Sequence, residues 1–185
     1  MPGKQIVVGT AHFASEMARA FSDAEFSLVY QPMIDLHTGR ITTCEALLRW
    51  NHPSRGVILP GNFVSLVEEF GFMPRLGRWV LHAALAEAAT WPGGTRVAVN
   101  ISAAQFLARR SCASRARRPD DRKPRPGRLE LEVAETIQPL PGNAFLRTLH
   151  QLRCLGVLLS IDDFGVGHSS FVSATRFRLR QNQNR

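Results

Sequence analysis

The stretch TTCEALLRWNHP, residues 42–53, alternates polar and apolar side chains over the length of one strand. Glu45 and Arg49 fall on the same side of an extended backbone, because successive side chains of a strand point to opposite faces. The opposite side is apolar and carries Ala46, Leu48 and Trp50. A central strand of an open parallel sheet is apolar on both faces, so the charged face of this strand indicates a different architecture.

Four other stretches have the same two-faced pattern and are predicted to be strands: 25–36, 96–102, 128–136 and 157–164. Apolar residues at helical spacing predict helices between them, over 12–21, 62–71, 73–91 and 143–156. Strands that alternate with helices indicate βαβ units and a mainly parallel sheet. With one apolar face under the helices and polar residues near the strand ends, the pattern is typical of an α/β TIM-like (β/α)8 barrel with its site at the C-terminal mouth.

The polar faces of these strands supply one candidate site. Its residues are Gln31, Glu45, Arg49, Asn100, Glu132, Asp162 and Asp163. Carboxylate and amide oxygens that converge from separate strands suit Mg²⁺ or Mn²⁺, and the cation offsets their mutual repulsion. The adjacent Asp162 and Asp163 have the spacing to serve two metals that activate water for attack on a phosphodiester. The planar guanidinium of Arg49 matches a pair of phosphate oxygens.

Plainer interpretations of the same residues stay open when each is taken alone. Glu45 and Arg49 are also compatible with an ion pair, and Asn100 with satisfying backbone groups at a strand end. Glu132 is compatible with a solvated carboxylate on an edge strand. The pair Asp162 and Asp163 before FGVG is compatible with a turn and a helix cap. The lone histidines, His52 and His168, are interpreted as structural.

Five motifs in order and spacing extend the pattern: YQP (30–32), EALLRW (45–50), VNIS (99–102), LELEVAET (129–136) and IDDFGVGHSS (161–170). Together they resemble the EAL-domain phosphodiesterases, which hydrolyse the bacterial second messenger cyclic-di-GMP to the linear dinucleotide. The DFG within the last motif also occurs in kinases, but the Gly-rich loop and catalytic-loop motifs of kinases are absent from this sequence.

The resemblance implies roles for individual residues. Metal ligands would be Glu45, Asn100, Glu132, Asp162 and Asp163, with Asp163 shared between two metals and with Glu45, Asp162 and Asp163 as the catalytic set. Nucleotide contacts would be Gln31, Leu47 and Arg49. Glu135 would brace the loop after the fifth strand, which in the family helps to assemble the metal site and a homodimer interface. Val166 and His168 stand in that loop where the family usually has Thr and Tyr.

The resemblance covers about five of the eight strands of the barrel, so the fold is expected to be incomplete. Strands six to eight of the family, with a catalytic lysine, a glutamate and a glutamine, have no counterpart here. We therefore divide the chain into an N-terminal extension (1–11), a partial EAL domain (12–171) and a basic tail (172–185).

Two segments carry the excess positive charge of the chain, whose formal net charge is +8. Residues 108–128 hold eight Arg, one Lys and three Pro, and residues 172–185 hold four Arg. Both lack apolar periodicity and interleaved aromatic residues, so we expect unpacked chain and no DNA or RNA partner. We interpret them as GC-rich coding DNA read out of frame, with a basic arm for an acidic partner as the alternative.

The composition, 44% hydrophobic and 21% charged, is that of an ordinary globular chain. No apolar run approaches the roughly 20 residues of a membrane helix, and no secretory h-region follows the N-terminus. The three cysteines match no zinc or CxxC spacing and are expected to be reduced thiols in a cytoplasmic protein.

Three functions follow from the sequence. The first is cyclic-di-GMP phosphodiesterase activity, which the missing lysine and strands are expected to abolish in this chain. The second is a non-catalytic module that binds the nucleotide or a protein. The third is a frameshifted product that does not fold stably.

Overall fold

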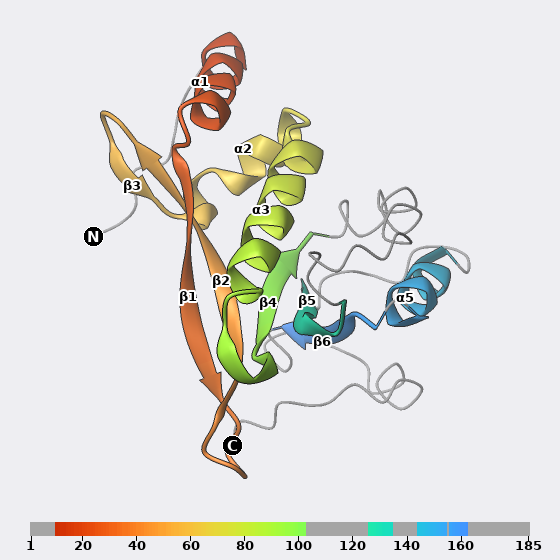
Figure 1. The fold of residues 1–185 in the computed structure, drawn as a ribbon. Helices are drawn as coiled ribbons and strands as arrows, with labels where there is room; N and C mark the ends of the chain where they lie inside the picture. Colours follow the sequence, from red (N-terminus) through yellow and green to blue (C-terminus); the bar gives the residue numbers. More distant parts are fainter. Residues whose placement is uncertain (1–9, 103–125, 135–143, 155, 163–185) are drawn as a thin grey trace.

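The computed structural model describes residues 10–102, 126–134, 144–154 and 156–162, and helices and strands alternate along them (Figure 1). In chain order the elements are α1 (Thr10–Ser22), β1 (Phe26–Ile34), β2 (Ile41–His52), β3 (Gly56–Ile58), η1 (Pro60–Asn62), α2 (Val64–Glu69), α3 (Met73–Ala88), η2 (Pro92–Gly94), β4 (Arg96–Ile101), η4 (Pro126–Arg128), β5 (Leu129–Ala134), α5 (Ala144–Cys154) and β6 (Leu158–Asp162). The five strands and four helices predicted from the sequence are all present. The short strand β3 was not predicted.

The strands form one sheet in the order β1-β2-β4-β5-β6, with β3 paired to β2. β1 and β2 are antiparallel, whereas the pairs β2–β4, β4–β5 and β5–β6 are parallel. A parallel pair needs a long crossover, and α3 and α5 lie in two of these connections. The sheet is therefore mainly parallel, as the alternation of strands and helices predicts.

The turn between β1 and β2 sets the register of the two strands. One side-chain oxygen of Asp35 accepts hydrogen bonds from the backbone N–H groups of His37 and Thr38, at 3.0 and 2.9 Å, and from the Thr38 hydroxyl at 3.1 Å. These bonds lower the pKa of Asp35. Gly39 follows with φ of +65°, a conformation that glycine adopts without strain. The turn therefore places Gln31 opposite Glu45.

The apolar face of the sheet packs under α3 and α5. Its buried side chains include Ala46 of β2, Val97 and Val99 of β4, Leu131 of β5 and Leu152 of α5. Each strand residue in this set belongs to the face that the period of two assigns to the core. The prediction that the helices cover the apolar face is confirmed (Figure 1).

A second core joins α1, α2 and α3 to the end of β2. The indole of Trp50 is fully buried and lies edge-on to Phe63 and Phe13, with ring centroids 5.3 and 6.4 Å apart. Met17 of α1 and Val67 of α2 are also fully buried here. The apolar side of α1 thus packs against the end of β2, against α2 and against the start of α3.

Buried charges reinforce this contact between α1 and β2. The carboxylate of Glu16, 3% exposed, lies 3.1 Å from Nε2 of His52 and 3.1 Å from a guanidinium nitrogen of Arg55. The Ser54 N–H donates to Nδ1 of His52 at 3.2 Å, and Nε2 of His52 lies 3.1 Å from both a Glu16 carboxylate oxygen and a guanidinium nitrogen of Arg19. His52 is structural, as expected.

A second buried carboxylate, that of Glu25, also connects α1 to β2. Glu25 accepts hydrogen bonds from Nε of Arg19 at 2.7 Å and from the indole N–H of Trp50 at 2.8 Å. Burial of Glu25 opposes ionisation, but these two bonds outweigh it and lower the pKa of Glu25. Glu25 therefore ties α1 to the largest aromatic side chain of the core.

The basic segment 108–128 lies largely outside the described residues, and the tail 172–185 lies wholly outside them. The last residues of the first segment form η4. The guanidinium of Arg128 donates to the backbone oxygens of Thr95 and Trp91, at 2.8 and 3.1 Å. Arg128, the first residue of the predicted strand 128–136, is therefore tied by hydrogen bonds to the segment just before β4. None of the helices that the structure describes has the length and apolarity needed to cross a bilayer.

Replacing Glu16 with alanine should lower the free energy of unfolding by about 3 kcal/mol, because His52 and Arg55 lose the carboxylate between them. Urea unfolding followed by far-UV circular dichroism measures the change. Glu69→Ala, at an exposed carboxylate of α2, is the matched control and should stay within about 0.5 kcal/mol of the parent chain. Equal losses in the two variants would contradict a role for the buried pair.

The depressed pKa of Glu25 predicts how stability varies with pH. A carboxyl group with a lower pKa in the folded chain stabilises it above the unfolded pKa, and this contribution is lost as pH falls through the folded pKa. The urea midpoint should therefore decline as pH falls below about 4.5. Glu25→Gln should reduce this decline, and an identical pH profile in the variant would exclude Glu25 as its source.

Candidate site on the polar face of the sheet

The face of the sheet opposite α3 carries the residues that the sequence singled out. In the β1–β2 pair, Gln31 lies opposite Glu45, Val29 opposite Leu47, and Ser27 opposite Arg49. These pairs lie on one face because they are separated by two residues along each strand. An apolar pair therefore sits between two polar ones.

Arg49 and Glu45 are not paired with each other. A terminal guanidinium nitrogen of Arg49 donates to the backbone oxygen of Leu48 at 2.8 Å. Glu45 accepts a hydrogen bond from the neighbouring strand instead, from Nδ2 of Asn100 at 2.8 Å. Among the ion pairs of the described residues none joins Glu45 to Arg49, so the simple ion-pair interpretation is wrong for this structure.

The hydrogen bond between Glu45 and Asn100 links β2 to β4. The pairing of β4 with β5 and of β5 with β6 places further polar residues of the site beside Asn100. Asn100 lies opposite Glu132, and Glu132 lies opposite Ser160. Asn100 is exposed, whereas Glu132 is 7% exposed. The parallel register thus brings Glu45, Asn100 and Glu132 onto adjacent strands, as the sequence predicts. Glu132 lies inside the sheet, between β4 and β6, so its interpretation as an edge-strand carboxylate is wrong.

Of the remaining predicted residues, only Asp162 lies among the described ones. Asp162 is the last residue of β6 and lies at the register position opposite Ala134, two positions beyond Glu132. Asp163 and Glu135 lie outside the described residues, as do Val166 and His168 of the following loop.

Ser160 is a member of this face that sequence reasoning did not select. Its hydroxyl oxygen is buried and has no hydrogen-bond partner among the described residues. A buried hydroxyl without a partner is uncommon in folded proteins. The signal for it was the period of two in LLSID, which puts Ser160 on the side of Asp162.

The donor set fits a hard divalent cation. Glu45 and Glu132 supply carboxylates, Asn100 an amide, and Ser160 a buried hydroxyl, all on neighbouring strands. Oxygen ligands of this kind are those that Mg²⁺ and Mn²⁺ prefer. Within the part of the chain that is described, no three His, Cys, Asp or Glu residues gather into a metal-binding group. The described residues therefore supply a partial ligand set.

The sequence of the chain is similar to a known family and to known proteins. The EAL domain family model matches residues 14–181. The bifunctional diguanylate cyclase/cyclic di-GMP phosphodiesterase MucR of Pseudomonas aeruginosa is 37% identical over 165 residues, which cover 87% of this chain and 24% of the relative. A cyclic di-GMP phosphodiesterase of the same organism is 39% identical over 149 residues, covering 79% of this chain and 25% of the relative. An uncharacterized protein of Sinorhizobium fredii is 41% identical over 154 residues, covering 83% of this chain and 19% of the relative. The chain thus spans between 19% and 25% of the length of these relatives.

Solved structures show the same fold. The MucR phosphodiesterase in complex with c-di-GMP matches with a TM-score of 0.79 at 34% identity, covering 90% of this chain and 69% of that chain. The EAL enzyme Bd1971, in its cAMP- and cyclic-di-GMP-bound form, matches with a TM-score of 0.78 at 29% identity, covering 92% of this chain and 48% of that chain. The predicted fold, an EAL-type barrel present in part, is confirmed.

Asn100→Asp should lower the free energy of unfolding by about 1 kcal/mol in EDTA at neutral pH, because it replaces the donor to Glu45 with a second carboxylate. The double variant Asn100→Asp/Glu45→Gln restores one donor and one acceptor with exchanged roles and should recover the loss. Urea unfolding followed by circular dichroism measures both. Asn62→Asp, in η1, controls for added charge. A double variant no more stable than the single one would contradict the importance of this bond.

Proposed function

Because the chain belongs to the EAL domain family, we propose that the polar face of its sheet binds cyclic-di-GMP and holds the divalent metals of a cyclic-di-GMP phosphodiesterase site. The observation that carries this proposal is the hydrogen bond from Asn100 to Glu45, which joins two motif residues 55 positions apart on neighbouring strands. The match to the structure of the MucR phosphodiesterase in complex with c-di-GMP supports the choice of ligand.

We assign the nucleotide contacts to Gln31, Leu47 and Arg49. The side chain of Leu47, opposite Val29, offers an apolar surface on which a guanine base packs, and Gln31 at the adjacent pair offers an amide for its polar edge. Arg49 lies two residues further along β2, where its guanidinium can exchange the Leu48 carbonyl for a phosphate oxygen pair.

We assign the metal ligands to Glu45, Asn100, Glu132, Asp162 and Asp163. These residues would hold a divalent cation, which would supply positive charge beside the phosphate and activate water for hydrolysis. Asn100 holds one Glu45 oxygen in place through its amide. In a domain that also supplies the family's catalytic lysine, hydrolysis would form a bond from the water oxygen to phosphorus and break one ester bond, and the departing sugar oxygen would take a proton. The product is the linear dinucleotide.

We extend the proposal to the loop after β6, to the oligomeric state and to the cellular location. Glu135 is proposed to brace the loop after β6 and to support a homodimer through that loop. We also propose a cytoplasmic location, in keeping with the reduced thiols expected from the sequence.

Calorimetric titration of the 185-residue chain with cyclic-di-GMP in the presence of Mg²⁺ tests the proposal. We expect heat of binding in the parent chain and binding weaker by about tenfold or more in Arg49→Ala, since a charge-assisted hydrogen bond contributes about 1.5–3 kcal/mol. Arg40→Gln removes the same charge from the exposed turn between β1 and β2 and should bind like the parent chain. Binding that is unchanged in Arg49→Ala would refute the assigned nucleotide face.

Incubation of the same samples with the nucleotide separates binding from turnover. The 185 residues contain no counterpart of the catalytic lysine that the resemblance implies, so we expect binding without Mg²⁺- or Mn²⁺-dependent hydrolysis. Chromatography of the products measures this. Turnover that disappears in Glu45→Ala would show that the described strands suffice for catalysis.

A further inference from the structure

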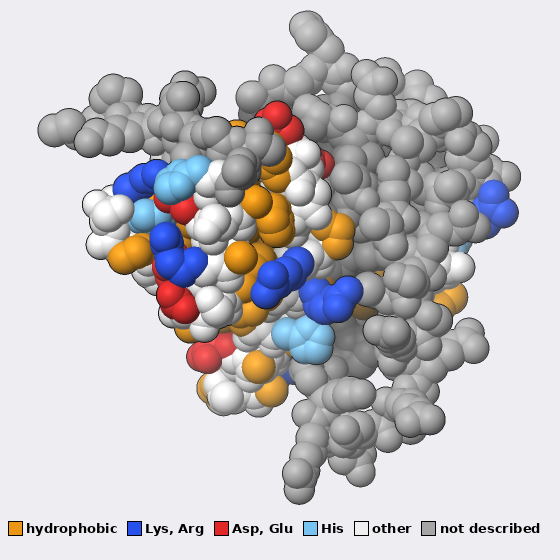
Figure 2. Space-filling model, turned by 90° about the horizontal axis from the view of Figure 1, so that it is seen from above, with side chains coloured by type: hydrophobic (Ala, Val, Ile, Leu, Met, Phe, Trp, Pro, Cys, Tyr) orange, Lys and Arg blue, Asp and Glu red, His pale blue; other side chains and the backbone are white. Residues whose placement is uncertain are grey.

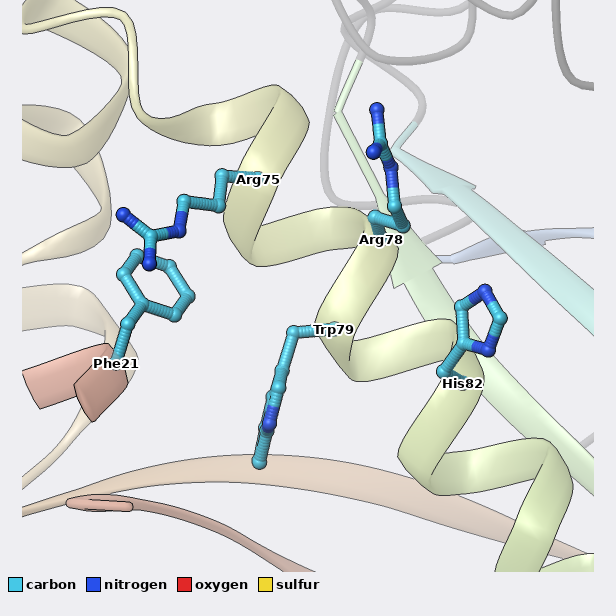
Figure 3. Close-up of a pocket in the computed structure, with 5 residues that line it drawn as sticks. All are labelled: Phe21, Arg75, Arg78, Trp79 and His82. Atoms are coloured by element: carbon cyan, nitrogen blue, oxygen red, sulfur yellow. The ribbon is translucent and has the colours of Figure 1, made fainter. Parts of the chain in front are cut away.

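A groove lies on the helical layer, on the other side of the sheet from the polar face. It is hollowed between the end of α1 and the first half of α3 and has a volume of about 350 Å³. Its lining residues are Phe21, Arg75, Arg78, Trp79 and His82 (Figure 3). The groove shares no residue with the proposed cyclic-di-GMP site.

Arginine and histidine side chains gather along one side of the groove. Arg75, Arg78 and His82 are spaced by three and four residues, which puts them on the same face of α3. All three are exposed, and none forms an ion pair with a carboxylate of the described residues. Figure 2, which looks down on the end of the molecule that carries α1, shows Arg and His side chains beside apolar ones. The groove therefore favours an anion.

Aromatic rings form the rest of the lining. The guanidinium carbon of Arg75 lies 4.1 Å from the ring centroid of Phe21, so this cation is already held in place by its π face. The indole of Trp79 is half-buried and projects between Phe21 and His82 in Figure 3. Its ring centroid lies 5.7 Å from that of Phe26, which supports it from the core. The groove thus combines one cation held over an aromatic ring with an indole that is supported from the core.

We propose that this groove binds a mononucleotide, with its base stacked on Trp79 and its phosphate held by Arg78 and His82. Base stacking on an aromatic side chain tolerates any base, and arginine matches phosphate oxygens with two parallel N–H donors. The hollow is open to solvent and has room for one base and its phosphate beside Trp79 and Arg78. This site is additional to the proposed function and does not depend on it.

Calorimetric titration of the 185-residue chain with AMP, in EDTA, tests the proposal. We expect saturable binding that is about tenfold weaker in Arg78→Gln and in Trp79→Leu, because each removes one of the two ligand contacts. Arg40→Gln, which removes a charge far from the groove, and Arg49→Ala, on the polar face of the sheet, should bind AMP like the parent chain. Near-UV circular dichroism verifies that each variant is folded, and His82→Gln, at an exposed position, gives a second test if Trp79→Leu does not fold.

Three results would overturn the proposal. Inorganic phosphate that binds as tightly as AMP would show that the base makes no contact. AMP binding that is lost in Arg49→Ala and kept in Arg78→Gln would place the nucleotide on the polar face of the sheet. An Asp-rich peptide that displaces AMP at lower concentration would identify the groove as a protein docking surface. Loss of cyclic-di-GMP binding alone would affect only the proposed function, because its residues lie on the other side of the sheet.

Discussion

The alternation of side chains along β2 is the constraint on which the rest of the structure depends. Ala46 and Trp50 must enter the core, so Glu45 and Arg49 must point to the other face. A slip of one residue in the pairing with β1 would bury the charges and expose the tryptophan, which makes any other register unfavourable. The Asp35 turn and the buried indole hold the register from the two ends of the strand.

The two faces of the sheet consequently differ in their contacts: one packs against the helices, and the other carries polar side chains. The apolar face is stabilised by α3 and α5, and α1 is fastened to it through Glu16 and Glu25. Carboxylates that are buried with arginine, histidine and indole donors are sensitive to the loss of any partner, so this end of the molecule tolerates few changes. The polar face, as far as the structure describes it, carries the amide of Asn100 and the carboxylates of Glu45 and Glu132.

The groove beside Trp79 lies on the helical layer, and this position separates it chemically from the polar face. The polar face is rich in carboxylates and needs a cation before it can hold a phosphate, whereas the groove presents cations directly. The two proposed sites would therefore recognise phosphate by opposite arrangements of charge. Arg75 and Trp79 reach the groove because α3 turns its remaining side, with Ala84 and Ala88, toward the sheet.

The sequence by itself determined the strands, the helices and the face of each strand residue, because these depend on periods of two and 3.6 residues that are local. Gln31, Glu45, Asn100 and Glu132 could be selected in this way, and the order of the five motifs identified the family. Only the tertiary structure decided which partners these residues have. The bond from Asn100 to Glu45, the burial of Glu132 beside Ser160 and the contact of Arg128 with the start of β4 join residues from different parts of the chain. The cluster of Glu16, His52 and Arg55 and the groove between Phe21 and His82 likewise depend on how α1 packs, which no local pattern specifies.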